Sequence, residues 1–437
     1  MKAIAKSTAQ IADQLQAYDP QALPAESVNT FLAELVSPLA ETEKVSLFDA
    51  LGRVLAENIV SPLNVPPHDN SAMDGFAFDG AQLQPGTPLR LTVVGTALAG
   101  KAWQGRVHSG ECVKIMTGAV MPAGLDTVVP QEFTQADGPA INIPPGALKA
   151  GDNRRHRGED LMAGRTALHQ GERLGSAALG LLASLGIAQV MVYRRLRVAY
   201  FSTGDEILSL GEAPREGAVY DSNRYTVFGM LTQLGCEVID LGVVRDDPVL
   251  LETAFIQAAR ADAVITSGGV SVGEADHTRQ MMKKLGDIAF WRIAMRPGRP
   301  MAVGRITAEP DHQEGRAPSS TSAVLFGLPG NPVAVMVTFI AFVRPALLRM
   351  MGARPEQPVM LRAVSEHPIR KKPGRTEYQR GIVTQHADGR LTVRLTGNQG
   401  SGVLSSMIQA NGLIVLDHQQ GAVKAGEEVS IMMLNAA

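Results

Sequence analysis

The strongest constraint on the fold is an alternation between apolar runs and amphipathic stretches from Arg197 to about residue 351. Strand-like apolar runs at 198–201, 263–266 and 324–326 are each followed by a loop rich in glycine and polar residues. Parallel strands need long crossover connections, which are usually helices, so this alternation predicts βαβ units. We therefore expect a mainly parallel sheet with its ligand site beyond the carboxyl ends of the strands.

The loops of this region combine glycine, hydroxyl and carboxylate groups at 204–206, 221–223, 246–247 and 267–276. Glycine lets backbone N–H groups approach a phosphate, whereas carboxylates repel a phosphate unless a hard cation lies between them. Mg²⁺ meets both demands because it bridges carboxylate and phosphate oxygens. Any one loop fits an ordinary turn, and Asp276 fits a helix N-cap. Four acidic loops at the strand ends of one domain favour the magnesium and phosphate interpretation.

The motif RPGRP at 296–300 places two guanidinium groups three residues apart on a chain stiffened by proline. Guanidinium groups offer forked donors that suit a tetrahedral oxyanion. The turn LPGNP at 328–332 precedes a helix, whose N-terminus also favours an anion. A turn with two solvated arginines is an equally good interpretation of the motif taken alone.

Outside this region the sequence predicts further domains. Short β-branched runs between 63 and 151 indicate a small inserted β domain, flanked by helical patterns at 26–35, 47–57 and 176–185. The segment 68–77 gathers several polar groups, but a tight turn with Asx hydrogen bonds explains it equally well.

The last 85 or so residues form a separate β unit with a hairpin around Asp388-Gly389. The polar residues 1–24 indicate a flexible leader, and 309–322 indicates a solvated surface loop.

Composition excludes several classes of protein. The 41 Lys and Arg against 43 Asp and Glu give a net charge of −2, so no global basic field attracts nucleic acid or an anionic membrane. The most apolar run, 333–343, is shorter than the ~20 residues of a membrane-spanning helix and predicts a buried helix instead. Two distant cysteines and the lack of a secretory signal pattern favour the reducing cytoplasm. The HExxH motif of zinc metalloproteases is absent from the sequence.

Five segments together resemble the molybdopterin molybdenumtransferase family, which includes the E domain of gephyrin: DNSAMDG at 69–75, KIMTGA at 114–119, STGDE at 202–206, SGGVSVGEAD at 267–276 and LPGNP at 328–332. The resemblance runs in order from about Val28 to the C-terminus. It implies a multidomain α/β plus β protein that forms a homodimer. The expected parts are a leader at 1–24, an elongated helical and β framework domain at 25–62 plus 152–192, an inserted β domain at 63–151, a mainly parallel α/β molybdopterin-binding domain at 193–351 and a C-terminal β-barrel at 352–437.

The resemblance also implies a reaction. This family takes adenylylated molybdopterin and molybdate, cleaves the pyrophosphate link with Mg²⁺-dependent release of AMP, and leaves molybdenum on the dithiolene. The implied partners are these two substrates, a second copy of the chain, other proteins of molybdenum cofactor biosynthesis and recipient molybdoenzymes.

Roles are implied residue by residue at matching positions. Catalytic roles fall on Asp74, Asp160, Glu206, Asp246 and Asp276. The metal is expected at Glu206, Asp246, Glu274 and Asp276. The pterin nucleotide is expected at Thr117, Gly204, Asp221, Asn223, Ser267, Gly268, Gly269, Ser271, Pro329 and Pro332. Molybdate is expected at Ser271, Arg296, Arg299, Pro300, Arg380 and Ser401. Asp74 and Thr117 match positions that face the active site across the dimer.

Two departures and two alternatives stay open. Arg296 and Arg299 stand where the family commonly has lysine, which leaves the choice between molybdate and tungstate open, and His68 stands where an aromatic residue is common. A molybdopterin adenylyltransferase uses a related α/β domain, but such a chain is much shorter. A non-catalytic scaffold like gephyrin is the other alternative, against which the complete acidic set argues.

Overall fold

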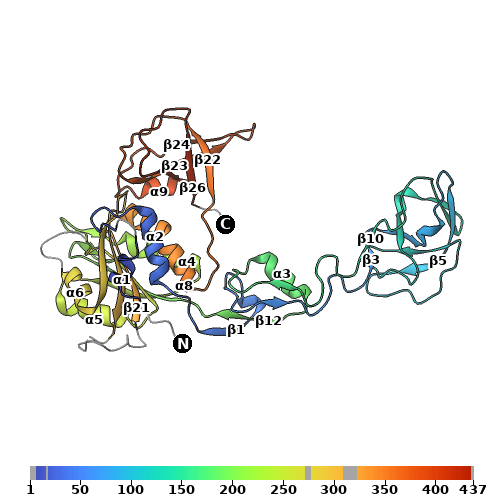
Figure 1. Ribbon diagram of the computed structural model, residues 1–437, viewed down its shortest axis with the longest axis horizontal. Helices are drawn as coiled ribbons and strands as arrows, with labels where there is room; N and C mark the ends of the chain where they lie inside the picture. Colours follow the sequence, from blue (N-terminus) through green and yellow to red (C-terminus); the bar gives the residue numbers. More distant parts are fainter. Residues whose placement is uncertain (1–5, 16–17, 271–276, 309–321, 435–437) are drawn as a thin grey trace. The chain divides into compact units, whose positions relative to one another are not determined.

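The structure, a computed structural model, describes residues 6–15, 18–270, 277–308 and 322–434 of the 437 residues (Figure 1). The chain divides into two compact units. Unit 1 holds residues 1–43, 52–56 and 191–437, and unit 2 holds residues 44–51 and 57–190. Two strands contain boundaries between the units, namely β1 (Thr42–Ser46) and β12 (Gln189–Tyr193).

A six-stranded sheet with the order β16-β13-β17-β21-β20-β18 forms the centre of the α/β part of unit 1. Four neighbouring strands are parallel, namely β16 (Glu237–Val244), β13 (Arg197–Thr203), β17 (Ala263–Ser267) and β21 (Ser322–Leu328). Two strands complete the sheet in antiparallel orientation, namely β20 (Pro300–Thr307) and β18 (Gly286–Arg292). The mainly parallel sheet expected from the sequence is confirmed.

Alternate side chains of β13 enter two separate cores. Val198 and Tyr200 lie in the core that contains α4 (Ser222–Leu234), whereas Ala199 and Phe201 lie in the core that contains α5 (Pro248–Ala258) and α6 (His277–Leu285). Both faces of the strand are therefore buried, which explains why it reads as a continuous apolar run. A short parallel pair, β14 (Ile207–Leu208) and β15 (Val219–Tyr220), lies in the connection before α4.

The expected buried helix at 333–343 is part of a longer helical stretch. It comprises α7 (Pro332–Thr338), the π-helical turn η4 (Phe339–Val343) and α8 (Arg344–Met350). Among the described residues this is the one stretch long and apolar enough to span a bilayer, but 67% of its most apolar window is buried inside the protein. Pro345 has no N–H for the carbonyl of Ala341, and Asn29 donates its Nδ2 to that carbonyl instead at 3.2 Å.

The N-terminal segment differs from the expected flexible leader over the described residues. α1 (Thr8–Ala12) begins with a capping box, and Thr8 donates both its backbone N–H and its hydroxyl to the carboxylate of Asp287 in β18. These two hydrogen bonds from the buried Thr8 fix the segment on unit 1, a contact that the polar composition of the leader did not indicate.

The first long helix, α2 (Ala25–Leu35), also belongs to unit 1 rather than to the framework domain expected at 25–62. Its apolar stripe lies in the same core as α7 and α8. Phe31 packs edge-on against Trp291 of β18 with ring centroids 4.8 Å apart. The stripe at 26–35 was predicted correctly, but a stripe does not reveal which domain covers it.

The C-terminal part of unit 1 is the expected β-barrel. β23 (Thr376–Gln385) pairs with both β24 (Leu391–Leu395) and β25 (Gly412–Leu416), and the strands β22 (Met360–Ser365) and β26 (Glu428–Met433) complete a closed ring of five. The predicted hairpin is confirmed by the antiparallel pairing of β23 with β24. The barrel also carries α9 (Ser405–Gln409) and pairs with the short strand β19 (Met295–Arg296).

Unit 2 contains the inserted β domain. Its six-stranded sheet has the order β7 (Thr127–Pro130), β4 (Gly75–Phe78), β6 (Glu111–Ile115), β5 (Leu89–Ala97), β9 (Ala140–Ile143) and β8 (Gln135–Asp137). Two further pairs are β2 (Ile59–Val60) with β11 (Thr166–Leu168) and β3 (Asn70–Ser71) with β10 (Arg154–Arg155). Single 3₁₀ turns η2 (Gly80–Gln82) and η3 (Gln131–Phe133) flank β4 and β7.

Two helix predictions for the framework part of unit 2 have opposite outcomes. α3 (Ser176–Ser184) confirms the expected helix, and Gly186 follows it in the left-handed region at φ 73°. The helix expected over 47–57 is wrong, because only the 3₁₀ turn η1 (Leu47–Asp49) forms. Gly52 then takes φ 74°, which stops any continuation of a right-handed helix.

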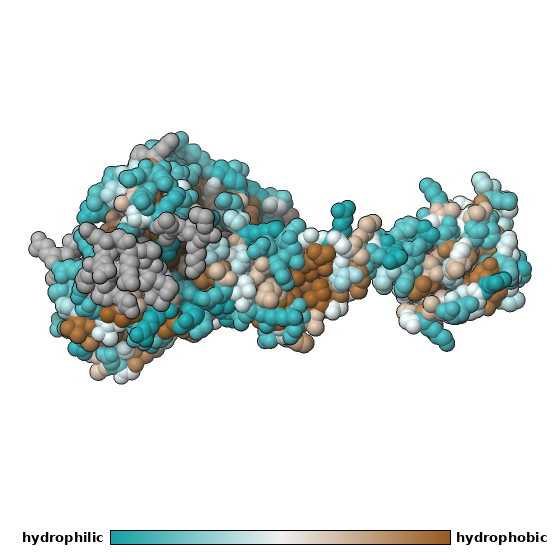
Figure 2. Space-filling model, turned by 60° about the horizontal axis from the view of Figure 1, so that its bottom comes forward, coloured by the Kyte–Doolittle hydropathy of each residue, from teal (hydrophilic) through white to brown (hydrophobic). Residues whose placement is uncertain are grey.

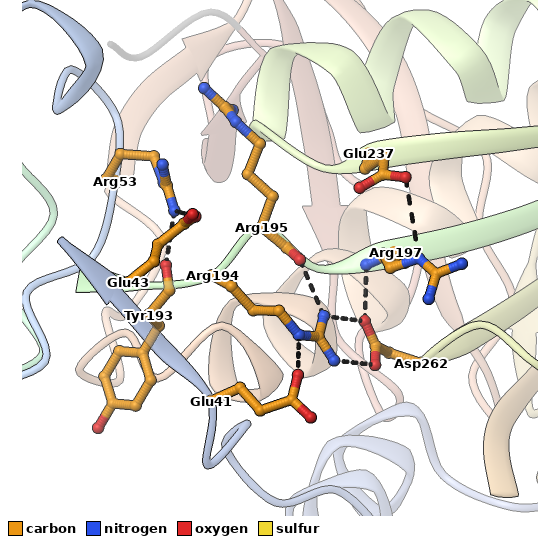
Figure 3. A network of polar contacts seen from close by, with 9 residues as sticks. All are labelled: Glu41, Glu43, Arg53, Tyr193, Arg194, Arg195, Arg197, Glu237 and Asp262. Carbon is orange, nitrogen blue, oxygen red and sulfur yellow. Dashed lines mark hydrogen bonds and ion pairs between the residues drawn. The ribbon is translucent and has the colours of Figure 1, made fainter. Parts of the chain in front are cut away.

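An ion-pair network fixes the start of β13 (Figure 3). Arg194 donates Nη1 and Nη2 to the two carboxylate oxygens of Asp262, each at 2.7 Å, and it also pairs with Glu41. Asp262 additionally accepts the backbone N–H of Arg197 at 2.7 Å. The hydrogen bonds that Arg194 donates to Asp262, followed by the one that it donates to Glu41, raise its pKa above the ordinary value. The positive charge of this arginine is therefore neutralised within the protein.

Candidate functional site

Four loops meet at the carboxyl edge of the parallel strands of unit 1. They begin after β16, β13, β17 and β21, and they contain the expected residues Asp246, Gly204, Gly268, Gly269 and Pro329. Ser267 ends β17, and Pro332 begins α7. The strands are parallel neighbours, so these loops lie side by side. The loop after β17 is linked to the end of β21, because the N–H of Gly268 donates to the carbonyl of Leu328 at 3.1 Å.

Two glycines after β17 are required by close backbone approach. Gly268 has φ 93°, and a Cβ there would clash with the carbonyl oxygen of Thr203 at the end of β13. Gly269 has φ 63°, and a Cβ there would lie 2.5 Å from the side chain of Thr278. Both positions therefore need glycine for space as well as for conformation. The expected backbone approach at 268–269 is consistent with this geometry.

Buried hydroxyl groups lie directly behind these loops. The Tyr200 hydroxyl lies 2.8 Å from Ser202 Oγ and 2.7 Å from Ser267 Oγ, and the two serine oxygens are 3.2 Å apart. Burial, followed by the charge of Asp221, raises the pKa of Tyr200 above its ordinary range. The phenol therefore stays neutral, and Ser267 is held as part of a hydrogen-bonded cluster at the end of β17.

Asp246 is held at the same edge by residues that the sequence did not single out. Thr278 Oγ1 lies 3.1 Å from Thr203 Oγ1 and donates to Asp246 Oδ1 at 3.4 Å. The backbone N–H of Asp246 donates to Asp205 Oδ1 at 3.3 Å. Thr278 stands two residues after the segment 267–276 and outside it, and Asp205 lies beside Glu206 in the segment 202–206. Their roles follow from contacts between segments distant in the sequence.

Two expected pterin-binding residues lie buried at the start of α4. Asp221 caps the helix by accepting the Arg224 N–H at 3.1 Å, and Asn223 donates Nδ2 to the carbonyl of Gly330 at 2.7 Å. The remaining acceptor atoms, Asp221 Oδ2 and Asn223 Oδ1, have no hydrogen-bond partner among the described residues. Asn223 thus joins α4 to the loop after β21, and two acceptors are available for a donor from water or ligand.

The remaining strand-edge residues are less connected. Glu206 is exposed, and its carboxylate lies against Gly204 so closely that a Cβ on that glycine would lie 2.5 Å from Glu206 Oε2. Among the described residues, no group of three or more His, Cys, Asp or Glu side chains forms a ready metal site. Ser271, Glu274 and Asp276 lie outside the described residues.

A second cluster brings together two of the arginines expected to bind an oxyanion. Arg296 lies in β19, which pairs in parallel with β23, so that Met295 stands opposite Thr376. Arg380 lies in β23, four positions after Thr376. Both arginines line one small cavity of about 20 Å³ together with Gln399 and the buried Glu377, whose carboxylate pairs with Arg375. We call Arg296, Arg380 and Gln399 the arginine corner.

Arg380 is buried almost completely, with 1% of its surface exposed, and its hydrogen-bond partners among the described residues are all neutral. Nε donates to Ser406 Oγ at 3.0 Å, and Nη2 donates to the carbonyls of Gly400 at 2.9 Å and Asn398 at 3.4 Å. These hydrogen bonds engage Nε and Nη2, and no residue in the described part of the chain accepts a hydrogen bond from Nη1. Burial, followed by the nearby charge of Arg296, lowers the pKa of Arg380 to about 10. The side chain is therefore still charged at neutral pH but has no counter-ion in its hydrogen bonds.

The other expected oxyanion residues flank this corner. The carbonyl of Ser401 accepts the N–H of Val333 at 3.0 Å, which ties the loop beside Arg380 to the start of α7. Arg299 has an exposed side chain, and its carbonyl accepts the N–H of Ile293 at 2.7 Å. Pro300 begins β20.

Three expected residues belong to unit 2. Thr117 donates its backbone N–H at 2.7 Å and its hydroxyl at 2.8 Å to Asp74 Oδ1, and these bonds lower the pKa of Asp74. Both side chains are exposed, as is Asp160, whose backbone N–H donates to Val65. The pairing of Asp74 with Thr117 joins the motifs at 69–75 and 114–119 and leaves a charged carboxylate at the surface.

Comparison with known proteins assigns nearly the whole chain. Family models match residues 23–186 as the MoeA N-terminal region (domain I and II), 199–349 as a probable molybdopterin binding domain and 362–434 as the MoeA C-terminal region (domain IV). A molybdopterin molybdenumtransferase of Haemophilus influenzae is 41% identical over 397 residues, which cover 90% of this chain and 94% of the relative.

More distant relatives agree. A molybdopterin molybdenumtransferase of Bacillus subtilis is 32% identical over 405 residues, 90% of each chain. The crystal structure of the molybdopterin biosynthesis moeA protein from Pyrococcus horikoshii superposes with a TM-score of 0.78 at 27% identity, covering 94% of this chain and all of that one.

Proposed function

Because this chain belongs to the molybdopterin molybdenumtransferase family, we propose that it inserts molybdate into adenylylated molybdopterin and releases AMP. The observation that carries the proposal is the arginine corner. Arg380 is buried and charged, it donates its hydrogen bonds to neutral groups, and it lies next to a second arginine. A bound oxyanion would stabilise these two positive charges.

The strand edge fits the nucleotide half of the substrate. Gly268 and Gly269 allow the backbone to approach a phosphate, and Ser267 offers a hydroxyl held by Tyr200. The free acceptors of Asp221 and Asn223 suit N–H donors such as those of a pterin ring. These residues would bind and orient the substrate, which is how positioning accelerates a reaction between two bound partners.

We assign Mg²⁺ to the acids of this edge because their donor chemistry fits it. Glu206 and Asp246 present only carboxylate oxygens, which hard cations prefer, and Glu274 and Asp276 would add two more. When bound, Mg²⁺ would neutralise the pyrophosphate charge. The protein's part is to hold Asp246 through Thr278, and to hold molybdate at Arg296 and Arg380.

The decisive assay feeds the purified protein two mixtures. With adenylylated molybdopterin, molybdate and Mg²⁺ we expect AMP release, whereas with ATP and molybdopterin we expect no adenylylated product. The reverse pattern would support the adenylyltransferase alternative. Asp276→Asn should suppress AMP release without changing the thermal unfolding temperature, and full activity of this variant would remove that residue from the mechanism.

We further propose that the active form is a homodimer in which Asp74 and Thr117 serve the site of the partner subunit. Exposed apolar side chains support an interface: Phe48 is 100% exposed in unit 2, and Phe228 of α4 is 50% exposed in unit 1. Figure 2 shows hydrophobic surface gathered on the part of unit 2 that carries α3. Apolar surface of this kind is typical of obligate interfaces.

Mixing two inactive variants tests the shared site. Subunits with Asp74→Asn and subunits with Arg380→Gln should together recover about a quarter of the wild-type activity, because half of the dimers are mixed and each holds one intact site. No recovery in a mixture shown to exchange subunits would contradict the proposal. In light scattering, Phe48→Glu should weaken the dimer, whereas Phe133→Glu, an equally drastic change at an exposed residue of η3, should not.

Cytoplasmic location and delivery to recipient molybdoenzymes complete the proposed role. A purely structural scaffold is the remaining alternative. Retained binding of partner proteins by a chain that releases no AMP in the assay above would favour that alternative.

A further inference from the structure

The hydrogen bonds around Arg380 point to a residue that holds the arginine corner in place. The ladder between β23 and β24 ends at the pair Gly381 and Leu395. One residue beyond it, the side-chain amide of Gln399 takes the place of a neighbouring strand. Its Oε1 accepts the N–H of Arg380 at 2.8 Å, and its Nε2 donates to the carbonyl of Arg380 at 3.1 Å.

This clamp shapes the loop 396–401 around the guanidinium group. The N–H of Thr396 donates to the carbonyl of Arg380 at 3.1 Å, and Gln399 Nε2 also reaches Thr396 Oγ1 at 3.3 Å. The loop then presents its Asn398 and Gly400 carbonyls to Nη2. The far end of the loop is fixed to α7 through Ser401.

We propose that Gln399 is a positioning residue for the oxyanion: it holds loop 396–401 on the Arg380 backbone, so that the loop orients the guanidinium with Nη1 free for molybdate. This inference rests on the proposed function. Gln399 lines the cavity shared by Arg296 and Arg380, so its loss would loosen the corner without removing either positive charge. A correctly charged but loosely held group loses affinity through misplacement.

The same barrel contains a matched control. Asn411 clamps Val383 on the same strand β23 with the same pair of hydrogen bonds: Oδ1 accepts the Val383 N–H at 2.7 Å, and Nδ2 donates to the Val383 carbonyl at 2.9 Å. Both amide side chains are half-buried. Asn411 therefore fixes the backbone of β23 in the same way as Gln399, but at Val383, three positions after Arg380 and outside the arginine corner.

The test compares Gln399→Met with Asn411→Leu, two changes that replace an amide by an apolar side chain of similar size. We expect both variants to lower the thermal unfolding temperature by similar amounts. Gln399→Met alone should raise KM for molybdate in the AMP-release assay, by roughly tenfold, with KM for adenylylated molybdopterin unchanged. Ser406→Ala, which removes the acceptor of Nε, should raise KM for molybdate by a smaller factor.

Two results would overturn the inference: an unchanged KM for molybdate in Gln399→Met, or an equal rise in Asn411→Leu. A wild-type protein that releases no AMP would contradict the proposed function instead. In that case calorimetric titration with molybdate alone still compares the two variants, and equal affinities would remove the positioning role.

Discussion

Two arginines of unit 1 show how the same side chain is used for structure and for binding. Arg194 meets two carboxylates, from Asp262 and Glu41, and their hydrogen bonds raise its pKa. Arg380 donates to one hydroxyl and two carbonyl oxygens, and burial beside Arg296 lowers its pKa to about 10. The first charge is neutralised within the protein, whereas no described carboxylate is hydrogen-bonded to the second.

The difference teaches where to look for a binding site. Desolvating a charge without pairing it costs several kcal/mol, so a fold keeps such a group only where something else compensates. At Arg194 the compensation is an ion pair that fixes the start of β13 (Figure 3). At Arg380 we assign the compensation to molybdate.

The largest expected effect is on catalysis at Arg380. Arg380→Gln should lower molybdate-dependent AMP release by about 100-fold, because the charge that holds the oxyanion is lost. Arg194→Gln, measured below its unfolding temperature, should change the rate by less than about twofold, because its partners lie at the other end of β13. Equal losses of AMP release in both variants would contradict the assignment of Arg380 to binding and of Arg194 to structure.

A smaller effect is expected on stability at Arg194. Asp262→Ala leaves Arg194 without its forked partner and the Arg197 N–H without an acceptor, which should destabilise unit 1 by about 2 kcal/mol. Calorimetry should record a lower unfolding temperature for unit 1, with AMP release unchanged at lower temperature. An unfolding temperature equal to that of the wild type would show that this ion pair does not stabilise the start of β13.

The lowered pKa of Arg380 predicts a pH dependence. The protonated form binds the anion, so affinity should be constant below the pKa of about 10 and fall as the pH rises through it. At pH 10.5 about a quarter of Arg380 remains charged, which corresponds to an about fourfold weaker molybdate affinity than at pH 8. Titration calorimetry at the two pH values checks this, and an affinity that increases with pH would contradict the sign.

The smallest expected effect is on stability, from an exposed ion pair in the network of Figure 3 that can be compared with the pair of Arg194 and Asp262. Arg197 and Glu237 form an ion pair at 3.8 Å with side chains that are 44% and 58% exposed. Exposed pairs contribute little, so Arg197→Ala should change the free energy of unfolding by less than about 0.5 kcal/mol. Thermal unfolding checks this, and a loss as large as that of Asp262→Ala would mean that burial does not separate the two pairs.

Local sequence pattern predicted the sheet and the strand-edge loops well, because buried parallel strands and the loops after them alternate visibly along the chain. It failed where the outcome depended on distant partners. The helix expected over 47–57 stops because Gly52 is left-handed, and α2 joins unit 1 because Trp291 and α8 cover its stripe.

The arginine corner was predictable only in part. Arg380 was predicted as a site residue only from the family resemblance, since no motif surrounds it. Gln399 and Thr278 were not predicted as site residues. Their importance comes from hydrogen bonds to segments that only the folded barrel or sheet brings close. Glutamine and threonine are common surface residues, so composition and spacing do not distinguish these two from others.

The most direct test of the account is the unfolding temperature of unit 1 with and without molybdate. Molybdate at 100 times its Kd should stabilise the wild type by about 2.7 kcal/mol, seen as a rise of several degrees, and should stabilise Arg194→Gln equally. Arg380→Gln should show no rise. A rise of the same size in Arg380→Gln, or none in the wild type, would contradict the claim that the buried charge of Arg380 awaits an oxyanion.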